Sequence, residues 1–351
     1  MTTYQSNQTS AHSATRHRRT FQTGRAQSAK SPKTTGPSFA RFRIEDQRHI
    51  LPAGRQSEST LQGEGTKLRI AVIGGLEEIG RNCTMLEYGN DIILIDLGLQ
   101  FPEEDMPGID YIIPNMGYLK GKEKNVRGII ITHAHYDHIG GIPHLVPMLG
   151  YPPIYGLPLT NAIIKKRQED YKGLRPLNIH NVGINDKLTL GSFQLEFFHL
   201  NHNIPDSMGV VIKTQEGTII HTGDWKFDYQ PTGEEPADLQ KVAKIGSEGV
   251  LALFSDSTNA SQPGHQISES EIGMNLEDII SKAPGRIIIG TFASLLTRIK
   301  QIIEVSEKLG KVVALGGFSI KSNVEIAKEL GYMKFNPKTL VDLRRLENYP
   351  H

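Results

Sequence analysis

The sequence of 351 residues is poor in cysteine and in long apolar runs. Its one cysteine, Cys83, excludes an internal disulfide and a zinc site built from several cysteines. No apolar run is long enough to cross a bilayer, and the N-terminus lacks the apolar core of a secretion signal. These absences predict a protein of the reducing cytoplasm that has no membrane partner.

Acidic residues are missing from the N-terminal segment. From residue 1 to residue 43 there are eight Lys or Arg and no Asp or Glu, whereas the whole chain has a formal net charge of only +1. The segment is rich in Ser, Thr and Gln, so it cannot bury enough apolar surface to fold by itself. We therefore expect a disordered basic tail over residues 1–65. It is either a solvated tail or an arm that attracts nucleic acid, and an organelle transit peptide is a weaker alternative.

Residues 66–260 show mainly strand patterns. Strands are predicted at Leu68–Gly75, on both sides of Gly89-Asn90, at Val126–Thr132, on both sides of Gly191, and on both sides of Glu216-Gly217. Helices are predicted at Asn161–Tyr171 and Pro236–Ile245. This order is typical of an α/β protein in which helices cover a sandwich of sheets.

Residues 261–351 follow a different rhythm, in which strands and helices alternate. "RIIIGTFAS" (Arg286–Ser294) and "KVVALGG" (Lys311–Gly317) are predicted strands. The helix predicted over Leu295–Gly310 carries Ile299, Ile302, Ile303 and Leu309 on one face, and a second helix is predicted to end at Gly331. This alternation predicts the beginning of a parallel α/β domain.

Ionisable residues are concentrated in "GIIITHAHYDHIGGIPH" (Gly128–His144), where a buried strand ends. Along an extended chain, His133 and His135 point the same way, and Asp137 and His138 follow where a helix begins. Imidazole and carboxylate groups are ligands of zinc and similar divalent ions. Because surface loops seldom gather four such groups in six residues, we expect a site for two metal ions.

Two later strand ends offer further ligands. "FFHLNHNIPDS" contains His199, His202 and Asp206, and "IIHTGDWKFD" contains His221, Asp224 and Asp228. A buried histidine is more often a hydrogen-bonded structural residue than a ligand, so each stretch alone is a modest signal. The glycines Gly74, Gly75 and Gly80 do not have the spacing of a nucleotide-binding loop, and we expect a tight turn there.

The combined motifs resemble those of the ribonuclease J family, which are nucleases of the β-CASP group with a metallo-β-lactamase fold. The resemblance covers about residues 68–317 and rests on "GGLEEIGRNCTMLEYG", "IIPN", "THAHYDHIGGIPHL", "NHNIPDSMGVVIKT", "HTGDWKFD" and "GVLALFSDSTNASQPG". It implies a metallo-β-lactamase αββα sandwich over residues 66–260. The first part of an inserted α/β β-CASP domain would follow over residues 261–351.

The resemblance also implies the roles of individual residues. His133, His135 and His202 match ligands of a first metal ion, Asp137 and His138 match ligands of a second, and Asp224 matches the carboxylate that bridges them. Asp137 is thereby also a catalytic residue. Asp256 matches an acidic residue that orients active-site histidines, although its own sequence context is equally typical of an Asx turn. For His199 the match implies a structural role, and for His221 an orienting one.

The implied activity is two-metal hydrolysis of RNA, by a 5′-to-3′ exonuclease that also cuts internally. The cofactors would be two divalent ions, with zinc expected first and manganese or magnesium as alternatives. The substrate would be RNA with a 5′-monophosphate, and the family implies a homo-oligomer.

The sequence departs from the family pattern in two places. Leu295–Thr297 replace a usual Asn-Ile-His, and the family's later motifs, including one more histidine ligand, have no counterpart before His351. Three alternatives therefore stay open. They are another hydrolase of the same fold, an inactive fragment that binds metal or RNA, and a scaffold protein that binds no metal.

Overall fold

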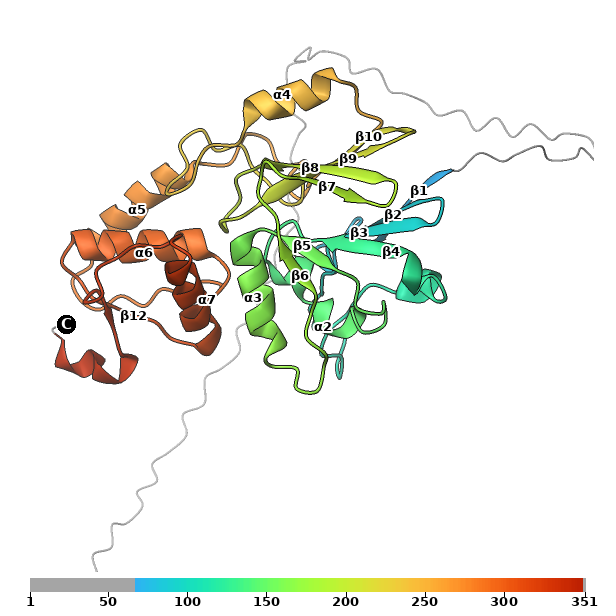
Figure 1. Cartoon of the computed structure of the whole chain (residues 1–351). Coiled ribbons are helices and arrows are strands. Elements are labelled where there is room, and N and C mark those ends of the chain that lie inside the picture. The colour runs from blue at the N-terminus through green and yellow to red at the C-terminus, as the bar shows by residue number, and fades with distance from the viewer. Residues whose placement is uncertain (1–66, 350–351) are drawn as a thin grey trace, which may run out of the picture. The chain divides into compact units, whose positions relative to one another are not determined.

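The computed structural model describes residues 67–349, which form two larger β-sheets, one small sheet and several helices (Figure 1). The basic tail predicted for residues 1–65 lies outside these residues. Among the described residues, no helix combines the length and the apolar character needed to cross a membrane.

The first sheet has six strands and is partly parallel. Its spatial order is β1 (Leu68–Gly74), β2 (Cys83–Tyr88), β3 (Asp91–Ile95), β4 (Val126–Ile130), β5 (Ile154–Gly156) and β6 (Ile179–Asn181). Strands β1 to β3 are antiparallel, and β3 to β6 run parallel. The parallel strands therefore end at one common edge of the sheet.

The second sheet has five strands. Its spatial order is β11 (Ala252–Phe254), β10 (Gly217–His221), β9 (Met208–Thr214), β8 (Phe193–His199) and β7 (Lys187–Leu190). Strands β7 to β10 are antiparallel, and β11 adds in parallel to β10. The predicted hairpins at Gly89-Asn90, Gly191 and Glu216-Gly217 therefore join neighbouring strands.

The helices lie outside the two sheets. They are α1 (Tyr136–Ile139), α2 (Ile142–Leu145), α3 (Pro158–Gln168), α4 (Leu239–Ser247), α5 (Glu269–Lys282), α6 (Leu296–Lys308) and α7 (Phe318–Glu329). Short 3-10 helices occupy Met116–Leu119, Glu123–Asn125 and Leu343–Asn348 (η3), and β12 (Val313–Ala314) pairs with β13 (Leu340–Val341).

Alternating side chains of the strands explain the layers. In β3, Ile92 and Leu94 pack with the core that includes α1, α2 and α3, whereas Ile93 and Ile95 face the core between the sheets. On the outer face of the second sheet, Phe198 and Val211 pack with Ile245 of α4. Because successive strand residues point to opposite faces, both faces of the central strands are buried. The αββα sandwich expected from the sequence is therefore confirmed.

One predicted element is absent. Arg286–Ser294 was expected to form a strand, but these residues adopt no regular structure and pair with no strand among residues 67–349. Ile288 is 98% exposed and Phe292 is 77% exposed. A strand requires a neighbour to satisfy its backbone groups, so apolar composition alone does not create one. The helices predicted to end at Gly310 and Gly331 are present as α6 and α7.

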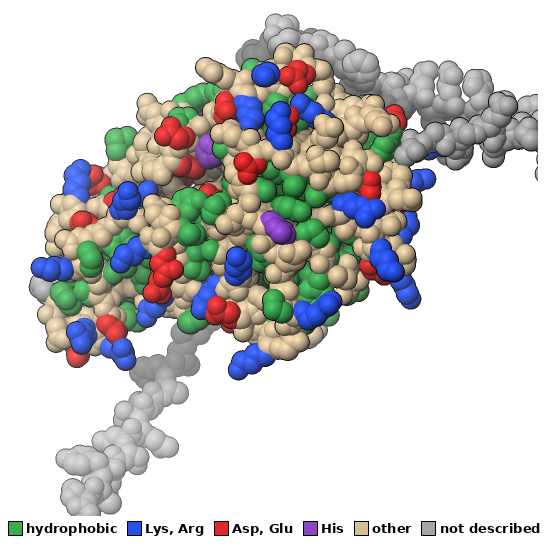
Figure 2. Space-filling view, viewed as in Figure 1, with side chains coloured by type: hydrophobic (Ala, Val, Ile, Leu, Met, Phe, Trp, Pro, Cys, Tyr) green, Lys and Arg blue, Asp and Glu red, His purple; other side chains and the backbone are tan. Residues whose placement is uncertain are grey.

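Charged side chains are scattered over the face of the molecule shown in Figure 2, where Lys and Arg are mixed with Asp and Glu. Positive charge is thus not gathered into one patch on that face.

Candidate metal centre

The candidate site lies where the parallel strands β3 and β4 end. Asp96 directly follows β3, and Thr132 and His133 follow β4 after one further buried residue, Ile131. The extended segment ends at His135, and the helix α1 begins at Tyr136. The carboxyl edge of a parallel sheet is the usual place for a site in such folds, because loops from several strands meet there.

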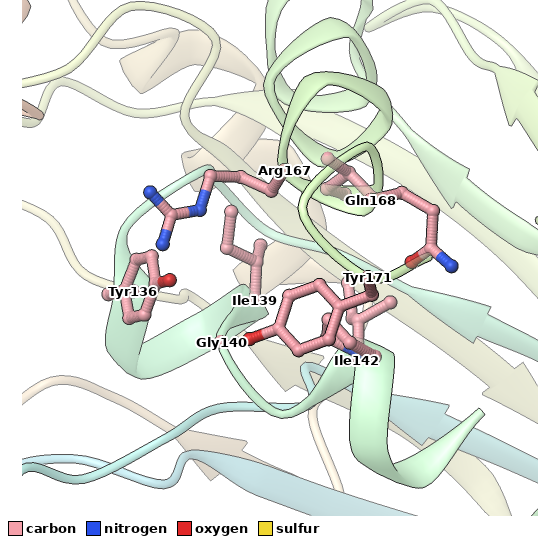
Figure 3. A pocket seen from close by; sticks show the side chains of 9 residues that line it. Tyr136, Ile139, Gly140, Ile142, Arg167, Gln168 and Tyr171 are labelled. Carbon is pink, nitrogen blue, oxygen red and sulfur yellow. The ribbon is translucent and has the colours of Figure 1, made fainter. Parts of the chain in front are cut away.

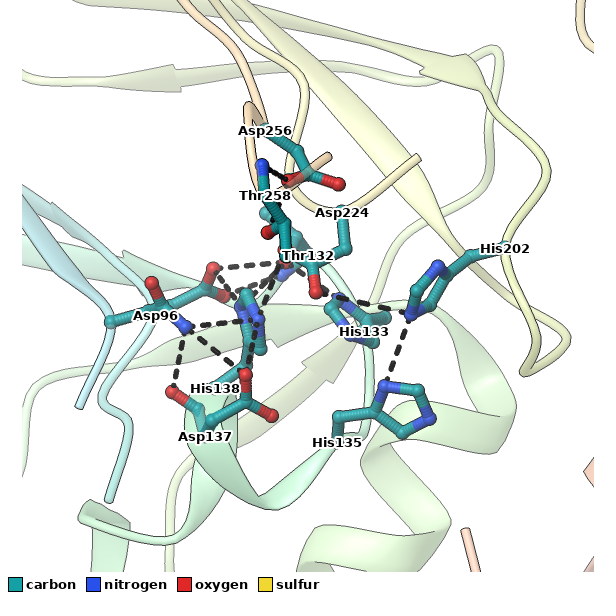
Figure 4. Close-up of polar contacts among 12 residues, drawn as sticks. Asp96, Thr132, His133, His135, Asp137, His138, His202, Asp224, Asp256 and Thr258 are labelled. Atoms are coloured by element: carbon teal, nitrogen blue, oxygen red, sulfur yellow. Dashed lines mark hydrogen bonds and ion pairs between the residues drawn. The ribbon is translucent and has the colours of Figure 1, made fainter. Parts of the chain in front are cut away.

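Three histidines form one group of possible metal donors. Donor atoms of His133, His135 and His202 all lie within 4.8 Å of one another. His202 Nε2 lies 3.1 Å from His135 Nδ1. His202 comes from the loop after β8, so the fold brings together residues that are distant in the sequence (Figure 4).

A second group shares His133 with the first. It contains His133, His138 and Asp224, whose donor atoms again lie within 4.8 Å of one another. Asp224 Oδ1 lies 3.3 Å from His138 Nε2, and its Oδ2 lies 3.9 Å from His202 Nε2. Asp137 Oδ2 lies 3.4 Å from the same His138 nitrogen. All six predicted ligands are therefore neighbours, and Asp224 faces both groups.

The unpaired nitrogens of this cluster fit a metal ion. The Nε2 atoms of His133 and His135 are buried and have no hydrogen-bond partner among the described residues. A buried polar atom without a partner costs free energy, which a bound cation would recover. The donor set of imidazoles and carboxylates is suited to zinc and to other divalent ions.

The first group of histidines is held in the neutral form. Burial lowers the pKa of His135 to about 3 and that of His202 to about 4. Burial, together with neighbouring histidines, also lowers the pKa of His133 well below its ordinary value. A neutral imidazole keeps the lone pair that binds a metal, so these three residues need lose no proton near pH 7.

His138 behaves in the opposite way. Burial lowers its pKa, but the carboxylates of Asp224, Asp137 and Asp96 outweigh burial and raise the pKa well above its ordinary value. Burial raises the pKa of Asp224, but the neighbouring histidines, His138 before His202 and His135, outweigh burial and lower that pKa below its ordinary value. Without a metal, a positive charge on His138 thus balances the surrounding carboxylates.

Asp96 is part of this site, although sequence reasoning did not single it out. Its side chain is 1% exposed and accepts hydrogen bonds from Thr132 N at 2.8 Å and from Thr132 Oγ1 at 2.9 Å. His138 Nδ1 lies 2.8 Å from Asp96 Oδ2. A carboxylate behind a histidine fixes the tautomer whose other nitrogen, Nε2, is free to bind a metal. The available signal was an aspartate directly after the apolar strand β3.

Asn82 was also missed. Its side-chain amide donates to the Asp137 carbonyl oxygen at 3.2 Å and to Asp137 Oδ2 at 3.3 Å, and it lies 3.1 Å from His138 Nε2. Asn82 ends the turn in which Gly75 and Gly80 have positive φ angles of 88° and 115°. The expected tight turn therefore delivers an amide to the second group of donors.

The other residues from the two strand ends lie elsewhere. His199 Nε2 contacts the Glu235 carbonyl oxygen at 3.0 Å. Asp228 accepts from Glu269 N at 2.8 Å and so caps α5. Asp206 accepts from Leu159 N at 2.7 Å, at the start of α3. Each of these side chains serves a loop or a helix end in this structure.

His221 and Asp256 lie beside the cluster. His221 Nδ1 accepts from Gly223 N at 3.1 Å, which supports the turn that presents Asp224. Asp256 Oδ1 accepts from Thr258 N at 2.9 Å and from Thr258 Oγ1 at 2.7 Å, an Asx turn. Among residues 67–349, no hydrogen bond joins the Asp256 carboxylate to a histidine, so its orienting role stays a prediction.

A shallow hollow lies close to α1 (Figure 3). It is lined by Tyr136, Ile139, Gly140, Ile142, Pro143, Ile164, Arg167, Gln168 and Tyr171. None of the six clustered donors belongs to this lining. The candidate site is therefore the His/Asp cluster at the strand ends and not this hollow.

Comparison with known proteins supports the resemblance to ribonuclease J. The chain is 41% identical over 300 residues to ribonuclease J of Thermus thermophilus, which covers 84% of the chain and 52% of that protein. It is 42% identical over 279 residues to ribonuclease J 1 of Streptococcus pyogenes, which covers 80% of the chain and 50% of that protein. The chain thus spans about half the length of these curated relatives. Residues 284–351 match the family model described as "Ribonuclease J, beta-CASP domain".

A solved structure shares the fold. A protein of unknown function from Enterococcus faecalis superposes with a TM-score of 0.59 and 15% sequence identity, over 82% of this chain and 76% of that one. Residues 76–262, more than half of the chain, match the model of the metallo-beta-lactamase superfamily. Together with the αββα sandwich, this match shows that the chain belongs to the metallo-β-lactamase superfamily.

Proposed function

We propose that this chain is a metal-dependent ribonuclease that hydrolyses phosphodiester bonds of RNA. The observation that carries the proposal is the pair of donor groups that share His133 at the carboxyl edge of the first sheet. The similarity to ribonuclease J supports RNA as the substrate. We further propose that the chain acts from a 5′-monophosphorylated end and also cuts internally, in the cytoplasm, as part of a homo-oligomer.

The proposed metal content is two divalent ions. His133, His135 and His202 would hold the first, Asp137 and His138 the second, and Asp224 both. When bound, such ions lower the pKa of a water molecule and stabilise negative charge on phosphoryl oxygens. We propose zinc because four of the six donors are imidazoles, with manganese and magnesium as alternatives.

The chain's own residues would orient these donors. Asp96 holds Nδ1 of His138, which leaves Nε2 directed at Asp224. The amide of Asn82 donates to Asp137 Oδ2 and so holds that carboxylate. Both contacts fix a donor before any ligand arrives, and preorganised donors lower the cost of binding and of catalysis. We propose Asp137 as a catalytic residue and Asp256 as a positioning residue.

Cleavage of RNA by the purified chain tests this function. We expect 5′-monophosphorylated RNA to be degraded when divalent metal is supplied, and the His135→Ala variant to lose this activity. Lys165→Ala is a matched control, because Lys165 is exposed on α3 and is not one of the donors. Equal degradation by the wild type and the His135→Ala variant would exclude this metal cluster as the catalytic site. Metal binding without degradation would favour the alternative of an inactive fragment.

A further inference from the structure

The loop that carries His202 is fastened at several points. It joins β8 to β9 through residues 200–207, and just beyond it Met208 N donates to the Thr132 carbonyl oxygen at 3.1 Å. Ile204 is fully buried in the core beside α3. Asp206, two residues later, has a positive φ of 64°. A non-glycine residue adopts this conformation only when its surroundings hold it there.

Two hydrogen bonds hold Asp206. Its Oδ2 accepts from Leu159 N at 2.7 Å, in the first turn of α3. Its Oδ1 accepts from Tyr332 Oη at 2.6 Å. Tyr332 follows α7, so its hydroxyl links the loop of His202 to a segment 126 residues away in the sequence. The Asp206 carboxylate is therefore the point where the loop, α3 and the end of α7 meet.

The position of this loop matters for the first group of donors. His202 contributes one of three imidazoles and is 16% exposed. Metal–nitrogen bonds have lengths of about 2.0–2.1 Å, and a site that is about 0.5 Å out of place binds poorly. A small shift of the loop would therefore change the affinity for metal without removing any donor.

We propose that Tyr332 is a positioning residue for His202, acting through Asp206. The inference rests on the proposed metal-dependent function and adds a partner to it, the segment at the end of α7. Because coupling between two sites is reciprocal, metal binding would in turn stabilise this segment. Binding at the metal site and the stability of the segment at the end of α7 would then be thermodynamically coupled.

The Tyr332→Phe variant tests the proposal, because it removes one hydroxyl and keeps the ring. Cobalt(II) serves as the probe, since its visible absorption reports the geometry of its ligands. We expect the variant to bind cobalt(II) about 10-fold more weakly than the wild type, with an altered absorption spectrum. The matched control is Tyr229→Phe, because Tyr229 is 74% exposed and should leave both readouts unchanged.

Unchanged cobalt affinity and spectrum in the Tyr332→Phe variant would overturn the proposal, even if the variant melts at a lower temperature. A wild type that binds no cobalt(II) would instead refute the proposed function itself. Hydrogen exchange of the wild type provides a measurement that does not depend on the variant folding. Metal should slow amide exchange in Phe318–Tyr332 more than in η3, which forms no hydrogen bond with residues 201–207 among the described contacts. Equal exchange with and without metal in Phe318–Tyr332 would also overturn the proposal.

Discussion

The Asp96→Asn substitution tests how the site is organised. The buried Asp96 carboxylate accepts from Thr132 N, from Thr132 Oγ1 and from His138 Nδ1. An amide of the same shape can accept at one end only, so its NH₂ group must face a donor. If it faces His138, the imidazole has to move its proton from Nδ1 to Nε2, the nitrogen needed by the metal. The substitution therefore favours the wrong tautomer while it keeps the volume of the side chain.

The expected loss of zinc affinity follows from the loss of the contact between the Asp96 carboxylate and His138. Removal of such a partner lowers metal affinity by about 10- to 100-fold, or about 1.4–2.7 kcal/mol. A mismatched buried polar group costs a further 1–3 kcal/mol, by order of magnitude, in the free energy of unfolding of the metal-free chain. Backbone strain adds little, because Asn tolerates the positive φ of 62° at this position at least as well as Asp does.

Isothermal titration with zinc measures the affinity, and urea unfolding in the presence of a chelator measures the stability. Asp91→Asn is a matched control in the strand β3. Asp91 also accepts hydrogen bonds, from Arg127 and Ser192, but it is not part of the cluster. The control should lose stability and keep its zinc affinity. The reasoning is refuted if the Asp96→Asn variant binds zinc as tightly as the wild type.

The remaining predictions concern a close approach and a buried carboxyl group. Gly98→Ala would place a Cβ atom on the carbonyl oxygen of Asp137, so the free energy of unfolding should fall by about 1–3 kcal/mol and zinc affinity should fall with it. Gly285→Ala, whose Cβ meets no atom within 4 Å, is the control in the same titrations. Burial raises the pKa of Glu234 to about 7, above its value of about 4.3 in an unfolded chain. The contribution of Glu234 to the free energy of unfolding is therefore greatest below about pH 4, and it is lost as the pH rises through 7. Glu234→Gln should remove this loss of stability between pH 4 and pH 8, which is about 4 kcal/mol at most. An unchanged pH profile of urea unfolding would contradict this assignment.

The site was predictable to the extent that its residues are close in the sequence or end an obvious strand. His133, His135, Asp137 and His138 fall within six residues, so their spacing alone indicated a cluster. His202 and Asp224 needed the resemblance, because neighbouring residues such as His199 and Asp228 have the same chemistry. Only the fold distinguishes His202 from His199 and Asp224 from Asp228, since the turn after each strand decides which side chain reaches the edge of the sheet.

Contacts between distant segments were not predictable from local patterns. Asp96 and Thr132 meet because β3 and β4 are parallel neighbours, and a single aspartate after a strand gives no sign of its partner. The contact of Tyr332 with Asp206 likewise depends on how α7 ends beside α3. In the opposite direction, residues 286–294 have the composition of a strand but lack a neighbouring strand among residues 67–349. Pairing is a property of the fold and not of the segment.

Zinc titration of the wild-type chain and the His135→Ala variant, at pH 7 and after removal of bound metal, tests the central claim most directly. The account predicts saturable zinc binding by the wild type. In the variant, the binding free energy of zinc at the tightest site should weaken by several kcal/mol, because one of three clustered imidazoles is gone. A wild type that binds no zinc, manganese or magnesium, or a variant that binds zinc as tightly as the wild type, would contradict it.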